Sequence, residues 1–447
     1  MISLVPGTIN RRLVIVVRAD PVICGHSGEA RNLAEVALTR GFDDVRIVTW
    51  PIDRLREVGL PLKPIDAILP YSCGITVERP EPVGDYKVPD GRYLAGIVGR
   101  LVELFTDGTS TVAMSLYLTP HDTAIADAVR IAAGTGLSVD VTTVAEAVGS
   151  DITNVVRSCV DSGNFGAAAG VLSTYLANDV CVAVSDFTKR LIVDAAEQID
   201  RSHGTEFARQ CRAKIGISYP AIDSSAYISL DPTETALVVG RRGLEVDEYV
   251  LFLSRLTKAK GVDDLIDGFA ASRASDSKRL VIAGNGPDAA MFRARAEAAG
   301  ISDRVLFFDD VDDAEKPHLM AGSAAYVLAS KPRPEFVETF GIALVEKMLA
   351  GGGPVITTAT GGIPEAVGDT ALVVPAGDTA AIAAALDDAL GRMTPADRAA
   401  ASAVAREYAL QFDRVNVFDR LAERIALARR RPEPLLTDTT LATVVAI

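Results

Sequence analysis

Short apolar runs that alternate with alanine-rich stretches of helical composition constrain the fold of this chain more than any other feature. These runs are rich in β-branched residues and lie at residues 13–17, 45–49, 180–184, 249–253, 280–283, 305–308, 326–328 and 354–357. Near-continuous apolar strands separated by helices are typical of a parallel sheet that is covered by helices on both faces. The pattern therefore predicts the α/β class with doubly wound sheets.

The strand and helix pattern occurs twice along the chain. The chain has 447 residues, which is more than one ordinary hydrophobic core holds. The pattern restarts near residue 249, after a segment, 218–248, that contains Pro220 and Pro232 and shows little periodicity. Such a segment indicates a connection between domains. We therefore expect an N-terminal Rossmann-like domain at 1–220 and a C-terminal one at 221–400.

The last part of the chain, residues 401–447, is predicted to form helices that cross back toward the N-terminal domain and end in a tail. Apolar residues at helical spacing support these helices, namely Val404, Tyr408, Val415, Val417, Leu421 and Ile425. By contrast, the proline-rich segment 51–91 is predicted to form loops.

Composition and charge exclude several classes of partner. The formal net charge is −14, from 45 basic and 59 acidic residues, and such a surface repels phosphate backbones and anionic lipids. We expect no nucleic-acid or membrane partner, and residues 13–17 are too short an apolar run for a signal peptide. Five scattered cysteines indicate a cytoplasmic protein with reduced thiols. A homodimer is left open.

The most informative segment is Glu338-Thr-Phe-Gly-Ile-Ala-Leu-Val-Glu346. A helix that begins near Phe340 leaves backbone N–H groups unpaired in its first turn, where the helix dipole is positive. Because Gly341 has no side chain, a phosphate can approach this helix end closely. Glu346 can accept hydrogen bonds from a ribose, and Glu338 can hold hydroxyls of a transferred sugar. Alternatively, both glutamates are surface residues of an amphipathic helix.

Two cations precede this segment in the second domain. A strand is expected to end near Leu253, and Arg255 and Lys260 then flank the turn into the next helix. Two cations at the carboxyl edge of a parallel sheet can clamp a diphosphate, and they stabilise charge that develops as the phosphate leaves. Two solvated surface cations are the alternative, and we favour the clamp.

Further motifs follow the same order as in one known family. They are Gly28 in Gly25-His-Ser-Gly-Glu29, residues 179–189, Tyr219-Pro-Ala-Ile-Asp223, residues 280–286 and Gly361-Gly-Ile-Pro-Glu365. Together with the two segments above, they resemble the family 4 retaining glycosyltransferases of the GT-B architecture, which include sucrose-phosphate synthases and mycothiol glycosyltransferases. Ala221 replaces a glycine that this family often has.

The resemblance implies two Rossmann-like domains that face each other across a cleft, with the acceptor in the N-terminal domain and the nucleotide held mainly by the C-terminal one. It implies transfer of a sugar from a UDP- or GDP-sugar, with retention, to a small polar acceptor such as a sugar phosphate, a cyclitol or a thiol, and without a metal or other cofactor. By matching position, the catalytic residues are Glu338, Arg255 and Lys260, and the donor-binding residues are Gly28, Arg255, Lys260, Val311, Glu338, Phe340, Gly341, Ile342 and Glu346.

The sequence departs from the family pattern on the acceptor side. Relatives often have a histidine after a central strand, and the corresponding stretch here, 139–146, has none. His26 and His121 are candidates for acceptor binding, although packing or surface histidines are equally good interpretations. The string Asp309-Asp-Val-Asp-Asp313 contains Asp-x-Asp, which we interpret as a solvated acidic turn in preference to a metal site.

Two other functions fit parts of the sequence. A sugar-nucleotide epimerase shares this architecture, but it would need histidines and carboxylates around the sugar in place of the Arg/Lys clamp. A non-catalytic sugar-nucleotide binding subunit could keep the donor residues and lack an acceptor site.

Overall fold

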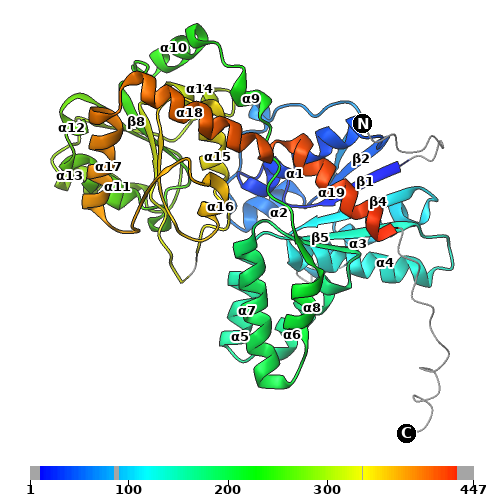
Figure 1. Cartoon of the computed structure of the whole chain (residues 1–447). Helices are drawn as coiled ribbons and strands as arrows, with labels where there is room; N and C mark the ends of the chain where they lie inside the picture. Colours follow the sequence, from blue (N-terminus) through cyan, green and yellow to red (C-terminus); the bar gives the residue numbers. More distant parts are fainter. Residues whose placement is uncertain (1–10, 85–89, 335, 430–447) are drawn as a thin grey trace.

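The computed structural model describes residues 11–84, 90–334 and 336–429. They form two α/β domains, each built on a parallel sheet (Figure 1). The strands of the first sheet are β1 Arg11–Val16, β2 Asp44–Val48, β3 Ile75–Glu78, β4 Ser110–Leu116, β5 Val141–Ala147, β6 Val180–Ala183 and β7 Ile215–Ile217. Their order is β3-β2-β1-β4-β5-β6-β7. This sheet confirms the predicted α/β class for the first half of the chain.

The second sheet repeats the same plan. Its strands are β8 Tyr249–Leu253, β9 Arg279–Ala283, β10 Val305–Phe308, β11 Ala325–Leu328, β12 Val355–Thr358 and β13 Leu372–Val374, in the order β10-β9-β8-β11-β12-β13. In each sheet the direction of winding reverses beside the first strand, between β1 and β4 and between β8 and β11. Ligands of doubly wound sheets bind at the carboxyl ends of the strands at this reversal, so both domains have a ligand-binding edge.

Helices cover both faces of the first sheet. They are α1 Gly25–Thr39, α2 Ile52–Glu57, α3 Gly91–Thr106, α4 Thr123–Gly134, α5 Arg157–Asp161, α6 Phe165–Ala177, α7 Asp186–His203 and α8 Phe207–Lys214. Buried residues of α1 pack on one face, and those of α3 and α4 pack on the other. The prediction of loops over 51–91 is wrong in part, because α2 and β3 lie there. As an edge strand of four residues that is only half-buried, β3 has no apolar run that would reveal it.

The second domain contains α9 Ser225–Ile228, α10 Pro232–Arg241, α11 Val262–Ala271, α12 Ala274–Ser277, α13 Ala289–Ala298, α14 Glu315–Gly322, α15 Ile342–Ala350, α16 Ile363–Val367 and α17 Thr379–Asp387. The connection 218–248 is more regular than its sequence indicated, since it carries α9 and α10. Asp231 caps α10 by accepting hydrogen bonds from the backbone N–H groups of Thr233 and Glu234. Pro232 therefore begins a helix, a position where its missing N–H costs nothing.

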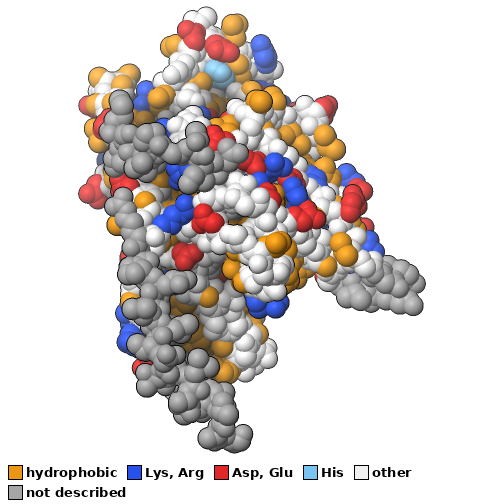
Figure 2. Space-filling view, turned by 90° about the vertical axis from the view of Figure 1, so that its right-hand side faces the viewer, with side chains coloured by type: hydrophobic (Ala, Val, Ile, Leu, Met, Phe, Trp, Pro, Cys, Tyr) orange, Lys and Arg blue, Asp and Glu red, His pale blue; other side chains and the backbone are white. Residues whose placement is uncertain are grey.

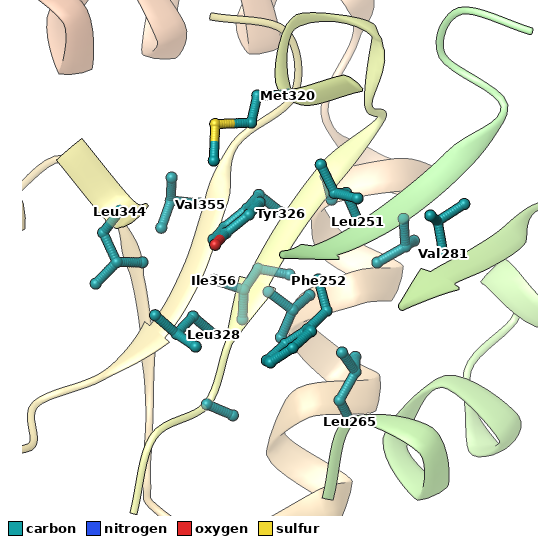
Figure 3. Close-up of a cluster of buried hydrophobic side chains, with 14 of the residues drawn as sticks. Leu251, Phe252, Leu265, Val281, Met320, Tyr326, Leu328, Leu344, Val355 and Ile356 are labelled. Carbon is teal, nitrogen blue, oxygen red and sulfur yellow. The ribbon is translucent and has the colours of Figure 1, made fainter. Parts of the chain in front are cut away.

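The core of the second domain lies where the central strands meet α11 and α15. Figure 3 shows Phe252, Tyr326 and their neighbours from β8, β11 and β12 packed together, and all are buried. Two buried tyrosines of this core have their hydroxyls satisfied by backbone carbonyls: Tyr326 donates to that of Leu253 at 2.8 Å and Tyr249 to that of Leu319 at 2.6 Å. A dense core of this kind fixes the strand ends that form the site below.

Two C-terminal helices run from one domain to the other (Figure 1). Helix α18, Pro395–Ala409, packs on α15 and α16, and α19, Arg414–Arg429, packs on α1. Between them, the backbone of Ile222 exchanges hydrogen bonds with Phe412 and Arg414 at 3.1 and 2.8 Å. The prediction that Val404 belongs to the apolar face is wrong, because this side chain is 62% exposed. The tail after Pro432 lies outside the described residues.

The described surface shows charges of both signs. On the face in Figure 2, acidic and basic side chains lie next to one another and do not form a patch of one sign. Within the described residues, we find no helix whose length and apolar composition would let it span a bilayer.

Substitution of Phe252 tests the core of the second domain. Phe252→Ala should lower the free energy of unfolding of this domain by about 3–5 kcal/mol, because it leaves a cavity under the central strand. The matched control is Val404→Ala at the exposed position, where a change within about 0.5 kcal/mol is expected. Urea denaturation followed by circular dichroism measures both. Equal stability of the two variants would contradict the packing in Figure 3.

Candidate active site

The first turn of α15 forms the centre of the candidate site. Gly341 precedes the helix with φ of 106°, a left-handed conformation that other residues rarely adopt. The N–H groups at the start of α15 have no partners within the helix, and the helix dipole is positive there. Phe340 is buried beneath this turn. The structure thus places Phe340, Gly341 and Ile342 at a helix end that is suited to an anion.

The backbone before α15 is held by the turn at Gly361 and Gly362. The N–H of Gly362 donates to the carbonyl of Glu338 at 2.9 Å. A Cβ atom on Gly361 would lie 1.9 Å from the carbonyl oxygen of Glu338, and one on Gly362 would lie 2.0 Å from that of Thr339. Only glycines allow this approach, so the Gly-Gly motif positions the segment that carries Glu338.

Lys260 and Glu338 form an ion pair next to this helix end. Lys260 ends a 3₁₀ turn, Lys258–Lys260, and is only 8% exposed. Its ammonium lies 4.7 Å from the centre of the Phe336 ring. Gly261 has φ of 70° and passes so close to Ala329 that a Cβ would lie 2.0 Å from its carbonyl oxygen. The turn that packs on the end of β11 thereby brings together two of the three predicted catalytic residues, Lys260 and Glu338.

Arg255 lies in the same turn but makes no contact with this pair. Its side chain is exposed, and among the described residues its guanidinium has no hydrogen bond or ion pair. The neighbouring Leu256 N–H donates to the carbonyl of Asn285 at 2.9 Å, which fixes the turn against the end of β9. The role of Arg255 in a diphosphate clamp stays a prediction.

Glu346 points toward two partners from other helices. Its Oε1 accepts hydrogen bonds from Lys316 Nζ at 2.7 Å and from Tyr227 Oη at 2.8 Å. Burial acts to lower the pKa of Lys316, but Glu346 and Tyr227 together outweigh burial and raise that pKa. Glu346 is therefore an oriented side chain, and its second oxygen can still accept a hydrogen bond from a hydroxyl.

The loop after β10 carries Val311 and the acidic string. Val311 is half-buried against the core of the second domain. Asp310 pairs with Arg242 at 2.8 Å, Asp312 accepts from the backbone at the start of α14, and Asp313 pairs with Lys63 of the first domain. Within the described ranges, no group of three or more His, Cys, Asp or Glu residues is arranged to hold a metal ion.

The first domain contacts the segment before α15, residues 338–341, at Thr339. Thr339 Oγ1 donates to the carbonyl of Val148 at 3.0 Å, and Ser185 Oγ donates to the carbonyl of Thr339 at 2.6 Å. Gly149 lies against the same threonine, where a Cβ would come within 2.0 Å. Glu365 also crosses between the domains, since its carboxylate accepts from the N–H groups of Asp186 and Phe187 at the start of α7. These contacts join the ligand-binding edges of the two sheets.

The start of α1 also lies close to α15. A Cβ atom on Gly25 would lie 2.9 Å from Ile342 Cδ1, whereas one on Gly28 would meet nothing within 4 Å. Both glycines are exposed. Gly28 thus lies on the first turn of a helix whose start contacts α15, and the space beside Gly28 is open. The contact of Gly28 with a nucleotide sugar stays a prediction.

His26 and His121 are brought together in the first domain. His121 is 2% exposed and lies between Trp50 and Tyr117, with ring centres 4.8 and 5.5 Å apart. His26 lies 6.5 Å from Tyr117. Burial and the neighbouring Arg18 lower the pKa of His26 to about 4, and burial, Arg18 and His26 lower that of His121 well below 6.5. Both imidazoles are therefore neutral near pH 7.

Comparison with known proteins shows that part of the chain is similar to a described family. Residues 242–406 match the family described as glycosyl transferases group 1. Most of the C-terminal domain is therefore similar to this family. The matched residues include Lys260, Glu338, Gly341, Glu346 and the Gly361 turn.

Relatives extend the likeness to other parts of the chain. An N-acetyl-alpha-D-glucosaminyl L-malate synthase of Bacillus anthracis is 32% identical over 167 residues, which are 37% of this chain and 41% of that protein. A D-inositol 3-phosphate glycosyltransferase of Mycobacteroides abscessus is 32% identical over 248 residues, 53% of this chain and 52% of that protein. The chain thus spans about half the length of the curated relatives it matches, or less.

Solved structures show the fold of the whole chain. The crystal structure of Anabaena Alr3699/HepE in complex with UDP-glucose superposes with a TM-score of 0.67 at 18% identity, over 93% of this chain and 99% of that one. The predicted GT-B fold, with two Rossmann-like domains, is therefore confirmed.

Residues 139–146, which lack the histidine that the resemblance implies, lie mostly within a strand. Most of this stretch is β5, and the loop after that strand begins at Val148. Glu146 is fully buried at the end of β5, and neither of its carboxyl oxygens has a hydrogen-bond partner. Burial, together with Glu29 and Asp151, raises the pKa of Glu146 well above its usual range, and burial raises that of Glu29 to about 8.

The two buried carboxyls predict how stability depends on pH. Between about pH 4.5 and 8 the folded protein keeps a proton that the unfolded chain releases, so that stability falls as the pH rises through this window. Glu146→Gln removes one such proton. The loss of stability between pH 6 and 8.5 should shrink in this variant, by up to about 1.4 kcal/mol per pH unit. Thermal unfolding at several pH values measures it.

The control for this experiment is Glu407→Gln, because Glu407 is exposed on α18. Its stability should follow the wild-type pH profile. A Glu146→Gln profile parallel to that of the wild type would mean that Glu146 is ionised in the folded protein.

Proposed function

We propose that the protein is a retaining, metal-independent glycosyltransferase of family 4 that transfers a sugar from a UDP- or GDP-sugar to a small polar acceptor. The observation that carries this proposal is the Lys260–Glu338 ion pair at the amino end of α15, beside the left-handed Gly341. The pair joins a cation suited to a phosphate and a carboxylate suited to sugar hydroxyls at one helix end.

The donor diphosphate is proposed to lie on the first turn of α15. There it would accept hydrogen bonds from the free N–H groups of the helix and benefit from its dipole. Lys260 has three N–H donors, so that it can bind a phosphate oxygen while it keeps Glu338 in place. Arg255, which is exposed and unpaired in the described structure, would approach the same diphosphate from the end of β8.

The catalytic contribution of these groups arises as the sugar–phosphate bond breaks. Negative charge then grows on the diphosphate, and cations and helix N–H groups that are already oriented stabilise it without reorganisation. Glu338 would fix the sugar through its hydroxyls, and Glu346 would accept a hydroxyl of the ribose. No step of this scheme needs a metal ion.

The acceptor is proposed to bind to the first domain, opposite Glu338. The names of the two relatives contain L-malate and D-inositol 3-phosphate, which are small polar molecules with hydroxyl groups. His26 and His121, the two candidates for acceptor binding, lie in this first domain. The scattered cysteines, with no disulfide among them in the described structure, fit a cytoplasmic enzyme.

A mixed-substrate assay tests the proposed reaction. The protein is incubated with UDP- and GDP-sugars and a panel of small polar acceptors, and products are followed by mass spectrometry. New glycoside with released nucleoside diphosphate is expected, with the donor's anomeric configuration retained by NMR and with no loss of rate in EDTA. An interconverted donor would indicate the epimerase, and nucleotide binding without turnover would indicate a binding subunit.

The ion pair predicts opposite effects for its two members. Lys260→Ala should weaken binding of the nucleoside diphosphate at least about tenfold, because a charge-assisted hydrogen bond is lost. Glu338→Ala should bind the diphosphate at least as tightly as the wild type, since Lys260 is then free, while turnover falls at least about tenfold. Calorimetry and steady-state kinetics measure the two effects. Full turnover in Glu338→Ala would remove this residue from the mechanism.

The Gly361-Gly362 turn predicts a purely positional effect. Gly362→Ala places a methyl group where the carbonyl of Thr339 lies and must move the Glu338 segment. Turnover should fall at least about tenfold. Gly240→Ala in α10 is the control, since a Cβ there meets nothing within 4 Å, and its activity should equal that of the wild type. Equal activities of the two variants would show that the turn does not position the site.

A further inference from the structure

We propose that the acceptor carries an anionic group, a carboxylate or a phosphate, and that Arg18 of the first domain binds it. The role of the bound anion as an acceptor rests on the proposed function, while the anion site itself rests on the structure alone. The site is the Arg18 cluster, which we define as Arg18, His26, Tyr117 and His121. It lies at the carboxyl ends of β1 and β4, where the winding of the first sheet reverses.

Arg18 is a cation that the described residues do not neutralise. It is half-buried, its guanidinium carbon lies 5.3 Å from the centre of the Tyr117 ring, and no hydrogen bond or ion pair engages its guanidinium within the described ranges. The chain has 59 acidic residues against 45 basic ones, and yet none of the described carboxylates pairs with Arg18. A half-buried guanidinium binds carboxylate and phosphate strongly and in a forked geometry.

Two acidic side chains that act on the same neighbours as Arg18, namely Asp20 and Asp151, are already engaged. Asp20 pairs with Arg31 at 2.8 Å and accepts from the hydroxyl of Tyr71 at 3.0 Å. Asp151 accepts from four backbone N–H groups, those of Leu118, Val148, Gly149 and Ile152. Neither carboxylate forms an ion pair with Arg18, so that its charge is available to a ligand.

The histidines add hydrogen-bonding groups without charge. Their lowered pKa values keep both imidazoles neutral near pH 7, and a neutral imidazole has one donor and one acceptor nitrogen. Both ring nitrogens of the buried His121 and Nδ1 of His26 have no hydrogen-bond partner in the described structure. A buried polar group without a partner is costly. The cluster therefore offers one positive charge and several unused hydrogen-bonding groups, which suits a hydroxylated anion.

The position of the cluster matches that of an acceptor. Gly25, next to His26, lies against Ile342 of α15. Ser150 contacts the Tyr117 hydroxyl at 3.5 Å, and its neighbour Gly149 packs on Thr339, which follows Glu338 in the chain. Both flanks of the Arg18 cluster thus contact the segment that carries the donor residues. An anion bound by Arg18 would hold the rest of its molecule close to Glu338.

The chain contains its own reporter for this site. Trp50 is the single tryptophan, and its ring lies 4.8 Å from that of His121. Malonate and inorganic phosphate are titrated into the full-length protein while Trp50 fluorescence is followed, with neutral malonamide as the reference. At least one of the two anions should give a saturable change that malonamide does not give.

Variants of Arg18 identify the binding group. Arg18→Gln should raise the Kd of the anion at least about tenfold, and Arg18→Lys should restore part of the affinity. Arg130→Gln is the matched control, because its side chain on α4 is 73% exposed, and its Kd should equal that of the wild type. Equal anion affinity in Arg18→Gln and the wild type, or no saturable change with either anion, overturns the anion site.

A second arm tests the link to transfer. Matched acceptor pairs, such as glucose 6-phosphate with glucose and L-malate with its diamide, are assayed with UDP- and GDP-sugars. The anionic member should have a kcat/KM at least about tenfold higher, and Arg18→Gln should remove this preference through KM for the acceptor with KM for the donor unchanged. The pair that shows the preference tells a phosphate acceptor from a carboxylate one.

The two arms separate the two ways of failing. Anion binding that Arg18→Gln abolishes, in a protein without transferase activity, would contradict the proposed function and leave the anion site standing. Transfer that favours the neutral member of each pair, or an anion preference that persists in Arg18→Gln, would contradict the inference and leave the proposed function standing.

Discussion

The backbone of Glu338, Thr339 and Gly341 is the constraint on which the candidate site depends. It is held from the second domain by Gly362, whose N–H donates to the carbonyl of Glu338, and from the first domain by Ser185, which donates to that of Thr339. Both contacts use main-chain carbonyls, so that they fix the segment whatever its side chains are. The Glu338 carboxylate, the amino end of α15 and the ion pair with Lys260 all take their positions from this segment.

The same segment couples the two domains. The Thr339 hydroxyl donates a hydrogen bond to the carbonyl of Val148 in the loop after β5, and the Glu365 carboxylate accepts hydrogen bonds from two backbone N–H groups at the amino end of α7. A carboxylate at a helix amino end is favoured by the helix dipole. Glu365, which belongs to the second domain, therefore stabilises the contact with α7 of the first domain. The residues that lie before and after α15 are therefore also residues that contact the first domain.

How much of this could be predicted from sequence differs between the domains. Lys260, Glu338 and Gly341 could be found because each lies in a short segment whose chemistry is contiguous, and β8 and β10 have the predicted bounds. Arg18 and Tyr117 were missed, since only the topology of the sheet brings them together with His26 and His121. The edge strand β3 is half-buried and has no apolar run that would reveal it. Prolines hide α9 and α10, and Asp231-Pro232, which indicates a linker in the sequence, begins a helix.

The central claim is that a diphosphate lies on the first turn of α15 beside Lys260. A crystal structure of the full-length protein with a nucleoside diphosphate bound tests it most directly. The account predicts phosphate oxygens within about 3 Å of a backbone N–H of this turn and of Lys260 Nζ, with Glu346 near the ribose. A diphosphate bound elsewhere, with Lys260 held by Glu338 alone, would contradict it.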